Sequence, residues 1–267
     1  MLIQANALRI PLADESVHCC VTSPPYFNAK EYSSWETYQD YLDDMNKVWY
    51  ECYRVLCDGG RIAINVPHGY DRPGNGGYKT IGDDTTESIK QCGFELRGHI
   101  IWSKMGLSPQ GTGTAWGSWK SASNPSLRDE HEIIIVAHKG SAKIPRSGES
   151  TIDRETFLEA TKSVWEIAPI SNSWHPAPYP PEIPRRLIEL YTYIDDIVLD
   201  PFVGSGTTIQ VAKSLGRRSI GIDLIRGYLR KALIPMALED KNWLRVRELM
   251  SKKEPTVITD LPMFGEL

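Results

Sequence analysis

The chain has 267 residues, of which 41% are hydrophobic and 24% are charged, a composition that fits one globular α/β domain and excludes a fibrous or disordered protein. No apolar run approaches the roughly 20 residues of a membrane helix, and the N-terminus lacks the basic region and cleavage site of a secretory signal. We therefore expect a cytoplasmic protein with no membrane partner. Five cysteines without a CxxC pair and six scattered histidines predict neither a disulfide framework nor a metal site.

Short β-rich runs recur along the chain and alternate with helical patterns. Seven of these runs are candidate strands, at residues 2–5, 17–22, 61–66, 99–102, 132–137, 197–199 and 219–222. Strands that alternate with helices and read as continuous apolar runs favour a mostly parallel sheet covered on both faces. The sequence therefore predicts a doubly wound α/β fold with a seven-stranded sheet.

Four helices are predicted from apolar side chains that recur every three or four residues. They cover residues 35–56, 183–193, 206–215 and 225–250. We expect the first to end at Gly59 and Gly60, and the third to end at Gly216. Pro235 should bend or break the last helix, because proline removes a helical hydrogen bond.

Two stretches do not fit the alternation of strands and helices. One covers about 105–128 and is rich in Gly, Ser and Trp, and the other covers about 140–163 and is polar. Because long loops of this kind are often functional, we expect one domain, residues 1–267, with two small insertions.

Between Arg97 and Arg146 there are seven Lys and Arg against three acids, in a chain of net charge −4. This local excess suits a cleft that faces phosphates, and an ordinary solvated surface explains it equally well.

The first chemical motif is a glycine-rich turn after an apolar strand, at residues 198–208 (Val-Leu-Asp-Pro-Phe-Val-Gly-Ser-Gly-Thr-Thr). Gly204 and Gly206 let the backbone approach a ligand, and the helix that follows presents unpaired N–H groups. The next strand ends at Asp223, where an acid can hold a ribose diol. The combination predicts a site for a nucleoside-containing cofactor. A packing turn followed by a surface acid is the structural alternative.

The second motif is Thr-Ser-Pro-Pro-Tyr at residues 22–26, directly after the apolar strand at 17–22. Two prolines alone would indicate only a rigid turn. The motif becomes specific if the substrate is the amino group of a base, whose nitrogen lone pair is conjugated into the ring, because such a site needs hydrogen-bond acceptors. Ser23 Oγ and the carbonyl of Pro24 can be those acceptors, and Tyr26 offers a ring on which a flipped base can stack.

In this order the motifs resemble those of the amino-group DNA methyltransferases of the β arrangement, whose catalytic motif precedes the cofactor motif. The resemblance covers nearly the whole chain, since the segments 101–104 (Ile-Trp-Ser-Lys), 131–134 (His-Glu-Ile-Ile) and 175–180 (His-Pro-Ala-Pro-Tyr-Pro) also look like the family's motifs. It implies the Rossmann-like S-adenosylmethionine-dependent methyltransferase fold, with S-adenosylmethionine as cofactor. Ser-Pro-Pro-Tyr is typical of cytosine-N4 enzymes, whereas adenine-N6 enzymes more often carry Asp in place of Ser23 and Lys in place of Tyr179.

The resemblance also implies roles for single residues. The catalytic set is Ser23, Pro24, Pro25 and Tyr26. The cofactor-binding set is Asn6, His175, Asp200, Pro201, Phe202, Gly204, Ser205, Gly206, Thr207 and Asp223. The family frequently has Asp in place of Asn6. The chain has no Pro-Cys dipeptide, so the covalent cysteine route to carbon 5 of cytosine is not expected.

Target recognition is expected in the two insertions. The candidate DNA-binding residues there are Trp116, Trp119, Lys120 and Arg128. They could contact phosphates or fill the space left by a flipped base, and simple packing of the two tryptophans under the loop is the alternative. Double-stranded DNA is the expected partner, and a cognate restriction endonuclease and a homodimer are further candidates. The alternative functions are an adenine-N6 DNA enzyme on the same fold, an RNA or protein methyltransferase, and a module that binds without methyl transfer.

Overall fold

The structure, a computed structural model, describes residues 1–29, 34–69, 77–104, 122, 129–170 and 179–239. Within these residues, eight strands form one sheet in the order β1-β8-β7-β2-β3-β5-β4-β6. The strands are β1 (Leu2–Gln4), β2 (Val17–Thr22), β3 (Leu56–Val66), β4 (Glu95–Ser103), β5 (His131–His138), β6 (Val164–Glu166), β7 (Ile197–Asp200) and β8 (Arg218–Asp223). All neighbouring strands are parallel except that β5 is antiparallel to both β3 and β4. The predicted mostly parallel sheet is confirmed.

The sheet has one strand more than the seven that the sequence predicts, and the extra strand is β6. It is the edge strand on this side of the sheet and pairs in parallel with β4, with Val164 opposite Ile101 and Trp165 opposite Trp102. Trp165 is buried, whereas Val164 is exposed. Its two apolar residues directly follow the polar stretch that was read as an insertion, so this short run did not stand out as a strand.

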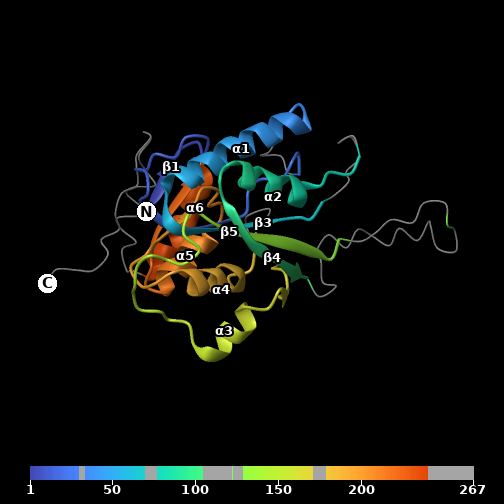
Figure 1. The fold of residues 1–267 in the computed structure, drawn as a ribbon. Coiled ribbons are helices and arrows are strands. Elements are labelled where there is room, and N and C mark those ends of the chain that lie inside the picture. The colour runs from blue at the N-terminus through green and yellow to red at the C-terminus, as the bar shows by residue number, and fades with distance from the viewer. Residues whose placement is uncertain (30–33, 70–76, 105–121, 123–128, 171–178, 240–267) are drawn as a thin grey trace.

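Helices cover both faces of the sheet (Figure 1). They are α1 (Tyr38–Val55), α2 (Ile81–Gln91), α3 (Arg154–Ala160), α4 (Glu182–Tyr191), α5 (Thr207–Ser214) and α6 (Arg226–Glu239). Helices α1 and α2 pack on one face, over β3, β4 and β5, while α4 and α5 pack on the other, against β2 and β7. Among the described residues, no helix combines the length and the apolar character that crossing a bilayer demands.

Helix α1 begins at a capping box. The side chain of Thr37 accepts a hydrogen bond from the backbone N–H of Asp40, and the carboxylate of Asp40 accepts one from the backbone N–H of Thr37. The buried face then recurs every three or four residues, at Tyr41, Met45, Val48, Trp49, Cys52 and Val55. This face packs on the sheet as the predicted spacing requires.

The prediction that Gly59 and Gly60 end this helix is wrong. Helix α1 ends at Val55, and both glycines belong to β3. Gly59 has φ +70°, and a Cβ there would lie 2.6 Å from Cδ of Pro145. Gly59 is therefore required by the close approach of the loop after β5, not by a helix end, whereas a Cβ on Gly60 would lie 2.8 Å from the carbonyl oxygen of Cys57.

Two further helices were not predicted, and a third continues through a proline at which a bend or a break was expected. Helices α2 and α3 were not predicted, because α2 carries mostly Thr, Asp, Glu and Gln and α3 has only seven residues. Helix α6 does not break at Pro235 but continues through it to Glu239. Helices α4 and α5 lie close to their predicted positions, and α5 is followed by Gly216 at φ +78°.

The carboxyl ends of β1, β8, β7, β2 and β3 meet at one edge of the sheet, because these strands are parallel neighbours. Strand β5 runs in the opposite direction, so it begins at this edge. We call this edge the carboxyl edge. The segments that leave it after β2 and β7 carry both sequence motifs, as expected for ligand sites in open α/β sheets.

Candidate active site

Asp200 joins the two motifs at the carboxyl edge. Its Oδ1 accepts hydrogen bonds from Thr22 Oγ1 at 2.7 Å and from the backbone N–H of Phe202 at 3.1 Å, and its Oδ2 accepts one from Thr208 Oγ1 at 2.7 Å. Burial raises the pKa of Asp200 to about 6, although these hydrogen bonds act in the opposite direction. The carboxylate therefore acts as a buried connection between the end of β2 and the turn after β7.

The glycine turn after β7 is held against β8 and α6. The backbone N–H of Val203 donates to the carbonyl of Ile222 at 2.9 Å. Gly204 and Gly206 have φ +46° and +83°, a region that residues with a Cβ rarely adopt. A Cβ on Gly206 would also lie 2.9 Å from Cβ of Ala232 in α6. Glycine is thus required both by the backbone angle and by the packing of α6.

Asp223, at the end of β8, faces this turn. Its Oδ2 accepts a hydrogen bond from the backbone N–H of Gly204 at 3.1 Å, and its Oδ1 accepts one from the N–H of Ile225 at 2.7 Å. Burial raises the pKa of this carboxyl. Asn6 follows the neighbouring strand β1 at the same edge, and its Oδ1 accepts from the backbone N–H of Leu8 at 3.0 Å.

These residues fit a nucleoside with an amino-acid tail. Asp223 has lone pairs left for ribose hydroxyls, since each carboxylate oxygen can accept more than one hydrogen bond. The N-cap of α5 is Gly206, and within the described residues no side chain caps the first turn, so its N–H groups can face a carboxylate. The site therefore suits S-adenosylmethionine, whose methionine part carries a carboxylate and whose adenosine part carries a ribose diol.

The loop after β2, residues 23–29, is called the base-side loop. Pro24 is buried, and Ser23 Oγ lies 3.1 Å from Tyr26 Oη. The next residue, Phe27, is buried and its ring makes an edge contact with Tyr38 of α1 at a centroid distance of 5.3 Å. This aromatic anchor and the rigid prolines fix the positions of Ser23 and Tyr26 beside the end of β2.

Glu132 is a site residue to which sequence reasoning assigned no role. Its Oε2 accepts hydrogen bonds from Tyr26 Oη at 3.1 Å and Asn65 Nδ2 at 2.6 Å, and its Oε1 forms an ion pair with Lys104 Nζ at 2.7 Å. The motifs at 101–104 and 131–134 contain Lys104 and Glu132, but no sequence signal joined them to the base-side loop. The link exists because β5 is antiparallel, so that its first residues lie at the carboxyl edge.

Tyr179 also reaches the site, since its hydroxyl contacts the hydroxyl of Thr208, which in turn donates to Asp200. Burial raises the pKa of Tyr179 well above its ordinary value. Several predicted residues lie outside the described part of the chain. They are the cofactor residue His175 and the DNA-binding residues Trp116, Trp119, Lys120 and Arg128.

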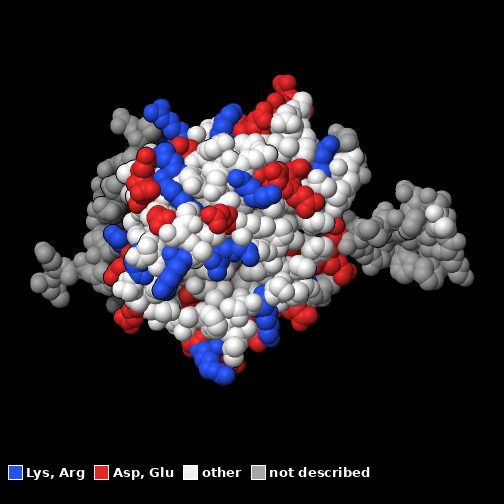
Figure 2. Space-filling model, viewed as in Figure 1, with Lys and Arg blue, Asp and Glu red and all other residues white. Residues whose placement is uncertain are grey.

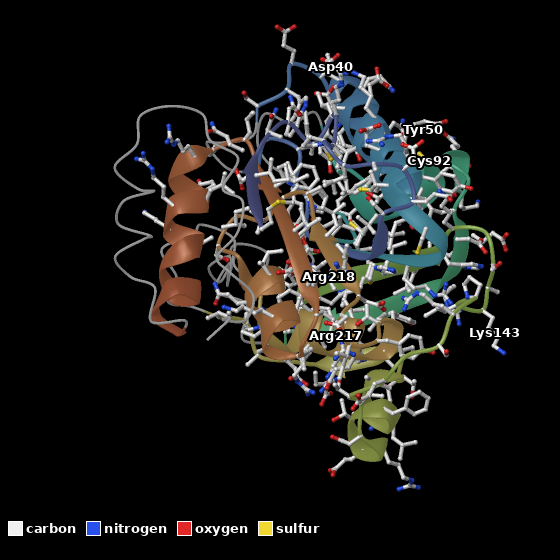
Figure 3. All side chains as sticks on the ribbon, turned by 90° about the vertical axis from the view of Figure 1, so that its left-hand side faces the viewer. Asp40, Tyr50, Cys92, Lys143, Arg217 and Arg218 are labelled. Carbon is white, nitrogen blue, oxygen red and sulfur yellow. The ribbon has the colours of Figure 1, made fainter. Side chains whose placement is uncertain are left out.

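Part of the second predicted insertion, residues 140–163, lies at the opposite edge of the sheet. Arg146 forms an ion pair with Asp196, just before β7, and Thr151 accepts a hydrogen bond from Arg217, just before β8. Figure 3 shows Arg217 at this amino end of β8. The recognition role of the insertion at 140–163 stays a prediction.

The charges of the described residues form no single basic field on the face in Figure 2, where basic and acidic side chains are interspersed. Of the basic residues predicted to face phosphates, Lys104 lies at the carboxyl edge, and its Nζ is paired with Glu132. Lys139 is at the opposite edge, where its Nζ lies 3.3 Å from Glu15. Three described basic residues of this segment, Lys104, Lys139 and Arg146, are thus paired with acids within the molecule.

The fold and the paired motifs together define a Rossmann-like methyltransferase. A family model described as DNA methylase, N6_N4_Mtase, matches residues 17–234. Type II methyltransferase M.MjaI of Methanocaldococcus jannaschii is 31% identical over 255 residues, which cover 80% of this chain and 82% of that protein. The chain belongs to the N6/N4 DNA methylase family.

Solved structures agree with this assignment. A putative DNA modification methylase from Thermus thermophilus, in complex with S-adenosyl-L-methionine, superposes with a TM-score of 0.72 at 28% identity, covering 89% of this chain and 93% of the other. The PvuII DNA methyltransferase, described as cytosine-N4-specific, has the same fold with a TM-score of 0.70 at 20% identity, covering 92% of both chains.

Proposed function

We propose that this DNA methylase transfers a methyl group from S-adenosylmethionine to N4 of a flipped-out cytosine in duplex DNA. The observation that carries the proposal is the position of Ser23, at the carboxyl edge beside the glycine turn, with its Oγ 3.1 Å from Tyr26 Oη. Ser-Pro-Pro-Tyr is typical of cytosine-N4 enzymes, whereas adenine-N6 enzymes of this arrangement more often have Asp in place of Ser23.

S-adenosylmethionine is the cofactor, and it supplies an electrophilic methyl group on a sulfonium. We assign the ribose to Asp223 and the adenine ring to the neighbourhood of Asn6, because Asp223 ends β8 and Asn6 follows the adjacent strand β1 at the carboxyl edge. The methionine part is assigned to the turn after β7, through Asp200, Pro201, Phe202, Gly204, Ser205, Gly206 and Thr207. A cofactor-binding role for the Pro-rich segment that begins at His175 stays a prediction.

The base-side loop can prepare an amino nitrogen for attack. The lone pair of this nitrogen is conjugated into the ring, so acceptors must bind its hydrogens and draw it toward tetrahedral geometry. We assign this to Ser23 Oγ and the carbonyl of Pro24, with Pro25 stiffening the loop and Tyr26 stacking on the base. The amino nitrogen would attack the sulfonium methyl group directly, without a covalent enzyme intermediate. The N–C bond would form as the S–C bond breaks, so that S-adenosylhomocysteine leaves and the methylated nitrogen releases one proton.

Identification of the methylated nucleoside tests this proposal. Duplex DNA treated with the protein and S-adenosylmethionine is digested to nucleosides and analysed by mass spectrometry, with a parallel preparation from cells that do not express the protein as the control for contaminating methylases. We expect N4-methylcytosine, and N6-methyladenine as the sole product would contradict the proposed base. In a parallel competition, duplex DNA, RNA and protein extracts are incubated together with labelled S-adenosylmethionine. Label in RNA or protein alone would reject DNA as the substrate.

We also propose that the protein acts in the cytoplasm as part of a restriction–modification system, with a cognate endonuclease as partner. The type II methyltransferases among its relatives support this context. A homodimer is a further proposal. Contacts with target DNA are proposed for Trp116, Trp119, Lys120 and Arg128.

A further inference from the structure

Glu132 lies at the centre of a hydrogen-bond network that joins three strands to the base-side loop. Asn65 belongs to β3, Lys104 directly follows β4 and Glu132 belongs to β5. The side chains of Lys104 and Glu132 are 16% and 13% exposed, so the ion pair is largely removed from water. Such a pair holds its partners in one geometry more firmly than a surface pair does.

The chemistry of these groups fixes the direction of the hydrogen bonds. An ionised carboxylate only accepts, so the single hydroxyl hydrogen of Tyr26 points to Glu132 Oε2. Tyr26 Oη must therefore accept in its 3.1 Å contact with Ser23, whose hydroxyl hydrogen it receives. The lone pairs of Ser23 Oγ are then left for a donor outside this chain of hydrogen bonds.

We propose that Glu132 is a positioning residue that sets this direction, so that Ser23 Oγ presents lone pairs to the amino group of the target base. The inference rests on the proposed function, because it takes an amino group as the substrate that Ser23 receives. Lys104 contributes by holding Oε1, which leaves Oε2 for Tyr26. Without the carboxylate, Ser23 and Tyr26 could exchange donor and acceptor roles.

Glu132→Gln reverses the direction at almost constant volume. The ammonium group of Lys104 can only donate hydrogen bonds, so the new amide oxygen turns to Lys104. The new NH₂ group then turns to Tyr26 and Asn65. The buried Asn65 Oδ1, which has no hydrogen-bond partner within the described residues, can receive one of these hydrogens once the Asn65 amide rotates. Tyr26 then accepts from the new amide and donates to Ser23, so the lone pairs of Ser23 are no longer all free.

A double-mutant cycle tests the proposal. Single-turnover transfer of a labelled methyl group to duplex DNA of mixed sequence is measured at saturating cofactor and DNA for the wild type, Glu132→Gln, Tyr26→Phe and the double variant. Glu51→Gln is the matched control, since Glu51 is also partly buried and paired with a cation, Arg54 at 2.8 Å, but lies in α1. Cofactor affinity, DNA affinity and melting temperature are measured for every variant.

We expect Glu132→Gln to lower the transfer rate at least roughly tenfold in the wild-type background, with unchanged affinities and melting temperature. In the Tyr26→Phe background the same change should lower the rate less than about twofold, because the hydroxyl through which Glu132 acts is gone. Equal reductions in both backgrounds, or a wild-type rate for Glu132→Gln, would overturn the proposal. So would a rate loss matched by Glu51→Gln.

The label is counted whichever base carries it, so the two proposals can fail separately. A product other than N4-methylcytosine contradicts the proposed base and leaves the double-mutant cycle readable. Absence of label from DNA treated with the wild type would overturn both.

Discussion

Thr22 Oγ1 donates a hydrogen bond of 2.7 Å to Asp200 Oδ1, across 178 positions of the sequence. Thr22 is the last residue of β2 and Asp200 the last of β7, and these strands are parallel neighbours. The bond therefore couples the base-side loop, which starts at Ser23, to the turn that is assigned to the cofactor. A methyl donor and its acceptor must be held at a fixed separation, and this contact is a direct means of holding them.

Thr22→Val should weaken this connection without leaving a cavity, because valine has nearly the same shape. Asp200 Oδ1 would keep only the N–H of Phe202, and we expect a loss of about 1–3 kcal/mol in the free energy of unfolding. Urea unfolding measures this loss. The control is Thr161→Val, at the exposed end of α3, where we expect a change within about 0.5 kcal/mol. Equal effects of the two substitutions would contradict a special role for Thr22.

Asp200 should make the stability of the protein depend on pH in a defined direction. Its pKa is raised from 3.8 to about 6 by burial, so between these values the folded protein holds a proton that the unfolded chain has released. The free energy of unfolding therefore falls as the pH rises through this window.

Asp200→Asn removes this titration. Relative to the variant, the wild type should lose about 1.4 kcal/mol of unfolding free energy between about pH 5 and pH 7.5. Urea unfolding of both proteins at the two pH values gives this difference. The unfolding free energy of the wild type minus that of the variant should fall with pH. A value that stays constant or rises between the two pH values would contradict the raised pKa of Asp200.

Gly206→Ala should disturb the turn after β7. It places a Cβ at φ +83° and 2.9 Å from Cβ of Ala232, so we expect about 1–2 kcal/mol of destabilisation and roughly tenfold weaker cofactor binding. Gly227→Ala is the control in α6, because the nearest atom to its Cβ is 3.9 Å away and alanine favours helices by about 1 kcal/mol. Calorimetric titration with S-adenosylmethionine and urea unfolding measure both effects. Unimpaired cofactor binding by Gly206→Ala would argue against the assigned turn.

Asp223→Asn should affect cofactor binding before turnover. An amide keeps one acceptor for the N–H of Ile225 but loses the charge that strengthens hydrogen bonds to ribose hydroxyls, so we expect at least about a tenfold rise in the cofactor Kd. The methyl-transfer rate at saturating cofactor should stay near that of the wild type. Asp153→Asn is the control, because Asp153 is the N-cap of α3 and asparagine caps helices equally well. An unchanged Kd in Asp223→Asn would remove the ribose assignment.

The sequence predicted the helices and strands whose apolar residues recur regularly. It did not predict contacts that depend on the direction of a strand. Both motifs follow apolar strands, so a parallel sheet brings them to one edge, and the structure confirms that Thr22 and Asp200 meet there. Glu132 was missed because it stands at the beginning of a strand. A polar residue in that position reaches the carboxyl edge only if the strand is antiparallel, and β5 alternates too little to reveal its direction.

Local patterns also misled the sequence reading at glycines. Gly59 and Gly60 followed a clear helical pattern and looked like its end, but β3 begins before them, at Leu56. What requires glycine at Gly59 is the approach of Pro145, which lies far along the chain. A single sequence contains no signal for such a contact, whereas the turn at Gly204 and Gly206 is recognisable from adjacent residues alone.

The most direct test of the proposed chemistry is the rate of methyl transfer by Ser23→Ala. Removal of Oγ takes away one acceptor for the amino hydrogens and leaves the residues assigned to the cofactor intact. Single-turnover transfer from labelled S-adenosylmethionine to duplex DNA is measured with both substrates saturating, together with the cofactor Kd. We expect a rate at least about 100-fold below that of the wild type, with an unchanged Kd. A variant that transfers methyl groups at the wild-type rate would contradict the role of the base-side loop.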